Sequence, residues 1–278
     1  PERDEEWAEA ERARIGEERF RREHECEFLI FDETLISSLV LADMEGVPPV
    51  ETTGQVRWFK RPTPGHTYMV SLDPSMGTGG DFAAIQVFEL PTFEQVAEWQ
   101  HNQTPMNQQV RILQGINKHI HDTIMEKDAS ATPQIFYSME NNSIGEAALM
   151  RVMDIGEENI MGMFLSEPIR KGHRRKFRRG FNTTAKHKID ACTKFKELVE
   201  NDKMKINSKL LITELKDFVA SGMSYSAKPG QHDDLVSACL LMTRMMKVLA
   251  DFDPKIFEKW TDRTSQITPM PIFGSFTG

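Results

Sequence analysis

The stretch Tyr68-Met-Val-Ser-Leu-Asp73, followed by Pro74-Ser-Met-Gly-Thr-Gly-Gly80, decides the fold. A short apolar run that ends in an acid predicts a buried strand, and the proline and glycines after it predict a sharp turn. Two more strands are predicted over Phe82–Leu90 and Phe93–Trp99, with only Pro91-Thr92 between them. Because short connections join antiparallel strands, these three segments predict an antiparallel meander.

Helices and strands follow the meander in turn. A helix that begins at Pro105 precedes a strand over Gln134–Glu140, which again ends in an acid. Further helices are predicted over Thr184–Val199 and Lys209–Val219, and a strongly apolar helix over Asp233–Leu249 is suited to packing on a sheet. The order predicts the α/β class, with one central mixed sheet flanked by helices.

The composition is that of a globular protein with an acidic balance. The chain has 278 residues and a formal charge of −8, with ordinary fractions of apolar and charged residues. We expect no membrane span and no signal peptide, because the apolar stretches are only as long as strands. Three scattered cysteines are too few for a disulfide framework and predict a reducing, cytoplasmic setting.

Acidic residues stand where predicted core elements end or begin, namely Asp73, Glu140 and the pair Asp233–Asp234. Carboxylates gathered at one sheet edge repel one another unless a cation neutralises them, and hard divalent cations prefer oxygen ligands. Taken singly, Asp73 could start a turn, Glu140 could face solvent, and the pair could cap a helix. Together they favour a metal site.

Two nearby residues are weaker candidates. Asp81 follows two glycines at the start of a strand and is either a turn residue or an accessory metal ligand. His232 directly precedes the acidic pair and could bind metal, accept a proton or simply end a loop. Of these three roles, the loop residue is favoured.

A basic segment is the second candidate for function. Between residues 170 and 179 the chain carries seven cationic side chains, no acid and an interleaved phenylalanine, with glycines that suit a loop. Such a cluster predicts contacts with phosphates that do not depend on base sequence, while a solvated loop or a peptide-binding patch is the alternative. The predicted DNA-binding residues are Arg170, Lys171, Arg174, Arg175, Lys176, Arg178 and Arg179.

Three motifs together resemble one family. Residues 70–84 (VSLDPSMGTGGDFAA), 138–142 (SMENN) and 230–236 (GQHDDLV) are similar to the nuclease domain of the phage large terminase subunit, most closely that of myophages with headful packaging. The resemblance implies an RNase H-like fold that binds one or two Mg²⁺ or Mn²⁺ ions and cuts concatemeric double-stranded DNA. It matches Asp73, Glu140 and the Asp233–Asp234 pair to the three acids of the family, and Asp81 to an accessory acid.

The resemblance also implies an organisation and partners. We expect a charged helical arm or linker over residues 1–66 that follows an ATPase domain, a nuclease domain over 67–251, and an irregular tail over 252–278. Portal protein and the small terminase subunit are the expected protein partners, and the host cytoplasm is the expected location. No Walker A sequence occurs in the chain.

Two other functions compete with a metal-dependent endonuclease. An actin-like ATPase or phosphotransferase also begins with a strand, an aspartate and a glycine turn, but it requires a second phosphate loop, which the sequence does not indicate. A non-enzymatic docking module would use the acidic surface to bind a basic partner such as portal or the small subunit.

Overall fold

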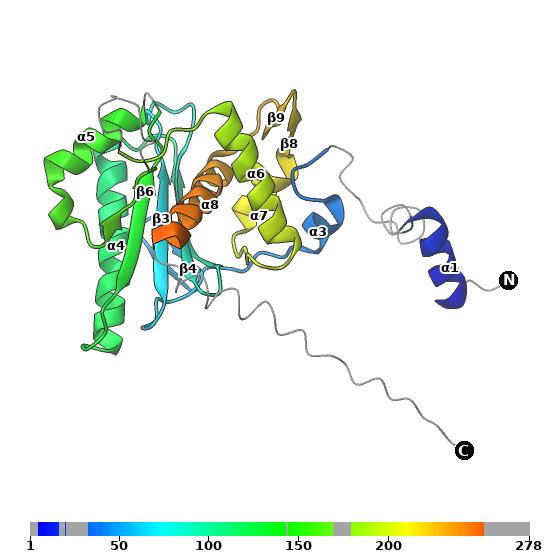
Figure 1. Cartoon of the computed structure of the whole chain (residues 1–278), viewed down its shortest axis with the longest axis horizontal. Helices are drawn as coiled ribbons and strands as arrows, with labels where there is room; N and C mark the ends of the chain where they lie inside the picture. Colours follow the sequence, from blue (N-terminus) through cyan, green and yellow to red (C-terminus); the bar gives the residue numbers. More distant parts are fainter. Residues whose placement is uncertain (1–4, 17–19, 21–32, 143, 169–178, 253–278) are drawn as a thin grey trace, which may run out of the picture.

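In the computed structural model, residues 5–16, 20, 33–142, 144–168 and 179–252 are described (Figure 1). Within this part, seven strands form one sheet in the order β1-β2-β5-β4-β3-β6-β7. They are β1 (Glu51–Thr53), β2 (Val56–Trp58), β3 (Thr67–Asp73), β4 (Ala83–Leu90), β5 (Glu94–His101), β6 (Gln134–Met139) and β7 (Met163–Phe164).

The sheet is mixed, as the sequence predicts. Strands β3, β4 and β5 pair antiparallel and form the predicted meander, whereas β6 pairs parallel to β3, and β7 parallel to β6. A parallel neighbour requires a crossover connection, and helix α4 (Met106–Lys127) supplies it between β5 and β6. The ends of β3 and β6 therefore lie next to each other at the same edge of the sheet.

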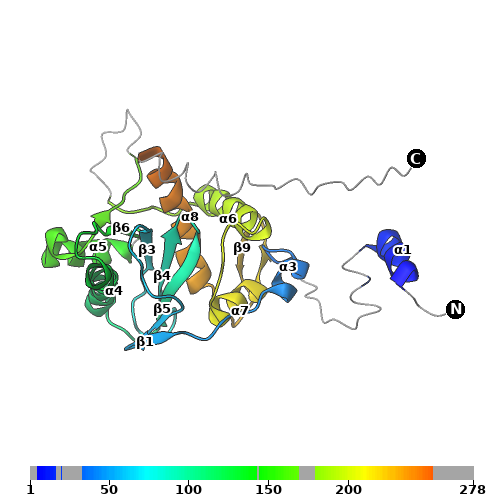
Figure 2. The ribbon, with the colours of Figure 1, turned by 90° about the horizontal axis from the view of Figure 1, so that it is seen from below.

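Helices cover both faces of this sheet (Figure 2). Helices α4 and α5 lie on one face, and α6, α7 and α8 on the other. The remaining described elements include a separate two-stranded hairpin, β8–β9. Their bounds are α1 (Glu5–Ile15), α3 (Ser38–Asp43), α5 (Gly145–Ile155), α6 (Ala185–Glu200), α7 (Lys209–Asp217), β8 (Phe218–Ser221), β9 (Ser224–Ala227) and α8 (Asp234–Phe252), with a short 3₁₀ helix at Glu157–Asn159.

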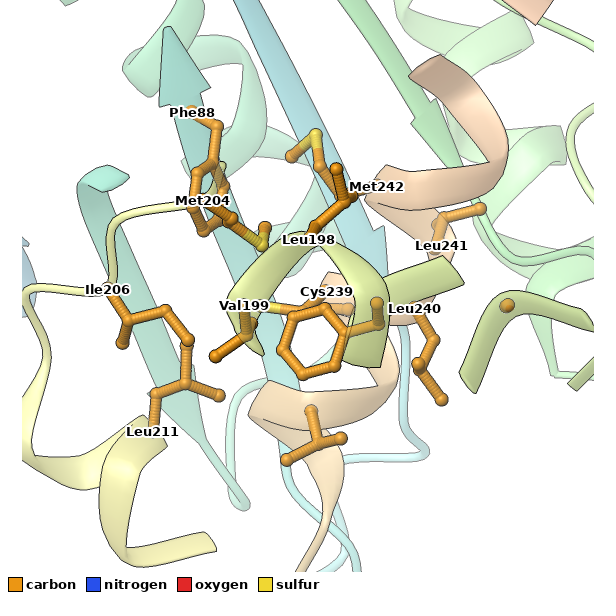
Figure 3. Close-up of a cluster of buried hydrophobic side chains, with 14 of the residues drawn as sticks. Phe88, Leu198, Val199, Met204, Ile206, Leu211, Cys239, Leu240, Leu241 and Met242 are labelled. Carbon is orange, nitrogen blue, oxygen red and sulfur yellow. The ribbon is translucent and has the colours of Figure 1, made fainter. Parts of the chain in front are cut away.

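The two faces of β3 bury different side chains because successive residues of a strand point to opposite sides. Tyr68 and Val70 belong to the core cluster under α4, while Met69 belongs to the cluster under α8. Figure 3 shows part of the α8-side cluster, which joins Phe88 of β4 with side chains of α6, α7 and α8 in one buried group. Helix α8 is buried along much of its length, as its apolar sequence predicts.

Some elements differ from the sequence prediction. Strands β1 and β2 add the sheet segment Glu51–Trp58, so the sheet begins upstream of residue 67, where the nuclease domain is predicted to start. Three-residue strands carry too little alternation to be recognised in sequence. The helix predicted to reach Val219 ends at Asp217, because the chain turns there into the β8–β9 hairpin.

Every helix in the described ranges is too short or too polar to cross a membrane. The predicted tail over 252–278 lies outside the described residues from 253 onward. Residues 1–4, 17–19 and 21–32 of the predicted charged arm also lie outside them.

Candidate metal centre

Asp73 and Glu140 lie side by side at the ends of parallel strands. Leu72 is paired with the residue that precedes Glu140, and the Glu140 N–H donates to the Leu72 carbonyl at 3.1 Å. Met69 and Phe136, four residues earlier on each strand, belong to the core cluster under α8. Because side chains alternate along a strand, Asp73 and Glu140 also point to the α8 face.

The two carboxyl groups are close enough to share a hydrogen bond. Burial and the charge of Glu140 raise the pKa of Asp73 well above its ordinary value, and Asp234 and Asp233 raise it further. Asn142 Nδ2 donates to Glu140 Oε2 at 3.1 Å and steadies that side chain. Without a cation, the ionised form of Asp73 is therefore disfavoured.

The turn after Asp73 is held by Gln109 of α4, which is fully buried. Its Nε2 donates to the carbonyls of Ser75 and Thr104, each at 2.8 Å. Gly77 has a φ of +69°, and a Cβ there would lie 2.2 Å from the Thr104 carbonyl oxygen. This close approach explains why glycine stands in the turn, since only glycine combines the positive φ with the missing side chain.

The acidic pair reaches the same edge from the start of α8. The Asp233 carbonyl accepts the Ser237 N–H at 2.7 Å, which closes the first turn of the helix, and Asp233 Oδ2 accepts from the Ala227 N–H at 3.3 Å. Ser71 Oγ donates to the Ala238 carbonyl at 2.8 Å and fixes α8 on β3. The helix start is thereby placed beside the end of β3.

Asp234 has a carboxyl oxygen that protein groups do not satisfy. Its Oδ2 is buried and, within the described residues, accepts no hydrogen bond; His232 Nδ1 is 3.6 Å away. Burial and the neighbouring Asp233 raise the pKa of Asp234 to about 6, although the Phe82 N–H donates to its carboxyl group. A buried carboxylate oxygen that accepts no hydrogen bond is costly unless a cation binds it.

The two weaker candidates lie on the Asp234 side of the cluster. Asp81 is exposed, and its charge helps to raise the pKa of Asp234. The His232 ring contacts the Phe82 ring edge-on, with centroids 4.7 Å apart. His232 thus has an aromatic contact in addition to its position beside the acids.

A cavity of about 200 Å³ opens beside the strand ends. Its walls come from β3, the residue after β6, and helices α6 and α8. Two cations face it together with the acids. The lining residues are Asp73, Glu140, Thr183, Lys188, Ala191, Ser237, Leu240, Leu241 and Arg244.

This donor set fits a hard divalent cation. Among the described residues, no three His, Cys, Asp or Glu side chains form a closed metal-binding group. The acids are instead divided between the touching pair Asp73–Glu140 and the helix pair Asp233–Asp234. Mg²⁺ usually keeps several waters and binds through one or two carboxylates, so it does not require a closed protein cage. The buried Asp234 Oδ2, which accepts no hydrogen bond from the described residues, also suits such an ion.

Residues 70–245 match the family described as the terminase RNase H-like domain. This match spans more than half of the chain and contains all four acids of the cluster. The chain belongs to this family. The RNase H-like fold predicted from the sequence motifs is therefore confirmed, as is the resemblance to terminase nuclease domains.

Solved terminase nucleases have the same fold as this terminase domain. The large terminase nuclease of thermophilic phage G20c with bound magnesium is 17% identical, with a TM-score of 0.56 over 77% of this chain and 97% of that chain. The large terminase nuclease domain of Thermus phage P74-26 is 18% identical, with a TM-score of 0.51 over 73% and 90% of the two chains.

The basic segment lies mostly outside the described residues. Of its seven cationic residues only Arg179 is described, and its guanidinium pairs with Glu157 and lies 5.3 Å from the centre of the Phe164 ring. Arg179 therefore contacts the protein's own surface at the end of the segment. The other six are Arg170, Lys171, Arg174, Arg175, Lys176 and Arg178, and their DNA-binding role remains a prediction.

Arg244 joins the two ends of the basic segment to α8 of the terminase domain. Its guanidinium donates to Glu167 before the segment, and to the Asn182 carbonyl at 3.0 Å and Thr183 Oγ1 at 2.9 Å after it. It also lies 5.2 Å from the centre of the Phe181 ring. Sequence reasoning missed this residue, because a single arginine within an apolar helix does not indicate its partners.

Lys188 of α6 was also missed. Its ammonium lies 3.8 Å from Asp233 Oδ2 and lines the cavity with Asp73 and Glu140. A signal was available: Lys188 precedes the apolar residues Ala191 and Cys192 by three and four positions, which places it on their helix face.

Proposed function

We propose that this terminase domain is a metal-dependent endonuclease that cuts double-stranded DNA during genome packaging, and that the acid cluster is its metal site. The observation that carries the proposal is the contact between Asp73 and Glu140, two carboxyl groups on neighbouring strand ends beside a cavity. Family membership supports the nuclease activity. The magnesium bound in the G20c nuclease supports the choice of ion.

Asp73, Glu140 and Asp234 would hold one or two Mg²⁺ or Mn²⁺ ions. Asp234 is the better candidate of the helix pair, because its Oδ2 is buried and has no hydrogen-bond partner in the part of the chain that the structure describes. Asp233 already accepts a hydrogen bond from the Ala227 N–H and pairs with Lys188. It would therefore lie beside the metal ligands without binding the ion directly. Exposed Asp81 would serve as an accessory ligand on the Asp234 side.

The carboxylates of the cluster and the elements that hold them would prepare the site for phosphodiester cleavage. When bound, a divalent ion activates water as a nucleophile and stabilises the leaving oxygen of a phosphodiester. Asp73 and Glu140 would bind the ion through their carboxylate oxygens. The parallel strand pair and α8 keep the carboxylates at fixed positions, which would orient a scissile phosphate bound beside them.

The wider assignment is also a proposal, supported by the sequence motifs that resemble this family. We propose cutting without strong sequence preference, with the basic segment 170–179 on the DNA backbone. The part of the predicted arm over residues 1–66 that precedes strand β1 would link the nuclease to an ATPase domain, and residues 252–278 would form a tail. Portal and the small terminase subunit would be its partners in the host cytoplasm, in a headful system of the myophage type.

Cleavage of supercoiled plasmid tests the proposal. Wild-type protein should nick and linearise the plasmid with Mg²⁺ or Mn²⁺ and leave it intact with EDTA. Asp73→Asn and Glu140→Gln should each lower the rate by at least about 100-fold while keeping the fold, since they remove proposed ligands. Asp122→Asn, on the exposed surface of α4, is the matched control and should cut normally. Cutting in EDTA, or by Asp73→Asn at the wild-type rate, would contradict the proposal.

A further inference from the structure

The acid cluster poses an electrostatic problem for a DNA-cutting site. Asp73, Glu140 and the helix pair bring four carboxyl groups to one sheet edge, and DNA is a polyanion. Bound metal neutralises part of this charge. A protein cation on the cavity wall would add to the attraction for a phosphate. The two cations that line the cavity, Arg244 and Lys188, are therefore the candidates for binding it.

The guanidinium of Arg244 is already hydrogen-bonded to other groups of the protein. Its guanidinium donates to Glu167, the Asn182 carbonyl and Thr183 Oγ1, and it is nearly buried, with a side-chain exposure of 12%. Lys188 differs. Among the described residues, its ammonium donates no hydrogen bond, and its charged neighbour is Asp233 at 3.8 Å, an ion-pair distance.

Helix α6 holds Lys188 in place by its stem. Ala191, Cys192 and Phe195, which lie three, four and seven positions further on, are buried in the α8-side core, so Lys188 continues that face toward the cavity. Its ammonium is 5.5 Å from the centre of the Phe218 ring. The side chain is 28% exposed, which leaves the ammonium within reach of a ligand in the cavity.

We propose that Lys188 is a DNA-binding residue of this site, whose ammonium contacts a phosphate oxygen of the backbone next to the metal-binding acids. This inference rests on the proposed nuclease function and adds a residue to it. A lysine ammonium is a compact point charge that suits a phosphate oxygen. Asp233 holds the ammonium at the cavity wall until the phosphate arrives.

DNA binding measured in an Asp73→Asn background separates this role from cleavage. With Mg²⁺ present, a labelled duplex is titrated at several salt concentrations. Adding Lys188→Met should weaken binding about tenfold at low salt and lower the salt slope by about 1, since one phosphate contact is lost. Lys188→Arg should keep the slope. Lys196→Met, about 12 Å further along α6, should change neither quantity.

A second background distinguishes phosphate binding from simple charge balance. If Lys188 only neutralises Asp233, Lys188→Met should have no effect once Asp233→Asn is also present. If Lys188 binds phosphate, the loss of affinity should persist in that background. An unchanged salt slope for Lys188→Met, an equal effect of Lys196→Met, or an effect that vanishes with Asp233→Asn would each overturn the proposal.

Steady-state cleavage gives the last readout. In otherwise wild-type protein, Lys188→Met should raise KM for DNA about tenfold with a smaller change in kcat, and Lys188→Arg should restore most of the loss. A fall in kcat with KM unchanged would contradict a binding role. Failure of the wild type to cut with Mg²⁺ would overturn the proposed nuclease function instead, and the binding data in the Asp73→Asn background would still decide the role of Lys188.

Discussion

The carboxyl groups of Asp73 and Glu140 lie close enough to share a hydrogen bond, at the ends of two neighbouring parallel strands. Each follows a buried strand, and each points to the face covered by α8. Such a contact between acids raises the pKa of Asp73 and makes the pair a poor arrangement for stability alone. It is a good arrangement for a cation, and the predictions below follow from it.

The helix pair should divide its roles unequally. Asp234→Asn should weaken Mg²⁺ or Mn²⁺ binding by at least tenfold, because it removes a proposed ligand whose Oδ2 accepts no hydrogen bond from the described residues. Asp233→Asn should weaken metal binding less, because Asp233 Oδ2 is bound to the Ala227 N–H and Lys188. Calorimetric titration with Mn²⁺ measures both. Equal losses, or a larger loss for Asp233→Asn, would show that the two roles are reversed.

Glu214 should make the stability of the metal-free protein fall as pH rises. Burial raises its pKa to about 8 from an ordinary value of 4.5, so the folded state binds this proton more tightly than the unfolded state. The free energy of unfolding should therefore decrease between pH 4.5 and 8, by up to about 4–5 kcal/mol for this group. Its oxygens accept from Gln100 Nε2 and the Val236 N–H near the start of α8.

Urea unfolding in EDTA at a series of pH values checks this dependence. Glu214→Gln resembles the protonated acid and should flatten the curve relative to wild type, leaving the contributions of Asp73 and Asp234. Glu197→Gln, on the exposed surface of α6, should leave the curve unchanged. If Glu214→Gln keeps the full wild-type slope, Glu214 does not titrate in this range.

Arg244→Gln should destabilise the fold by about 2–4 kcal/mol, because it removes a nearly buried cation and leaves Glu167 and the Asn182 carbonyl without their donor. It should also weaken DNA binding if residues 170–178 bind the backbone, since Arg244 fixes both ends of that segment. Arg151→Gln breaks an exposed pair with Asp154 and should cost less than about 0.5 kcal/mol. Urea unfolding compares the two variants, and equal costs would contradict the role of Arg244.

The sequence was sufficient to predict the parts of the site that are local. The strand before Asp73, the strand before Glu140 and the helix after Asp233 are each visible as apolar patterns, and their order predicts a mixed sheet. The family motifs then indicate the RNase H-like fold. The parallel register that brings Asp73 beside Glu140 depends on the crossover through α4, which a pattern of residues does not specify.

The remaining parts depend on tertiary contacts. Arg244 reaches partners some sixty to eighty positions earlier in the chain, and Lys188 meets Asp233 only because α6 packs beside α8. Strands β1 and β2 are too short to show alternation. The net charge of −8 says little about DNA binding, because a total does not show where the charges lie.

The binding of Mn²⁺ tests the central claim most directly, because it does not depend on DNA, partners or cleavage. Electron paramagnetic resonance of free Mn²⁺, recorded while protein is added, measures how much ion is bound. Wild-type protein and the surface control Asp122→Asn should take up Mn²⁺ equally, and Asp73→Asn and Glu140→Gln should each bind at least tenfold more weakly. Uptake by Asp73→Asn and Glu140→Gln equal to that of wild type would contradict the assignment of this acid cluster as the metal site.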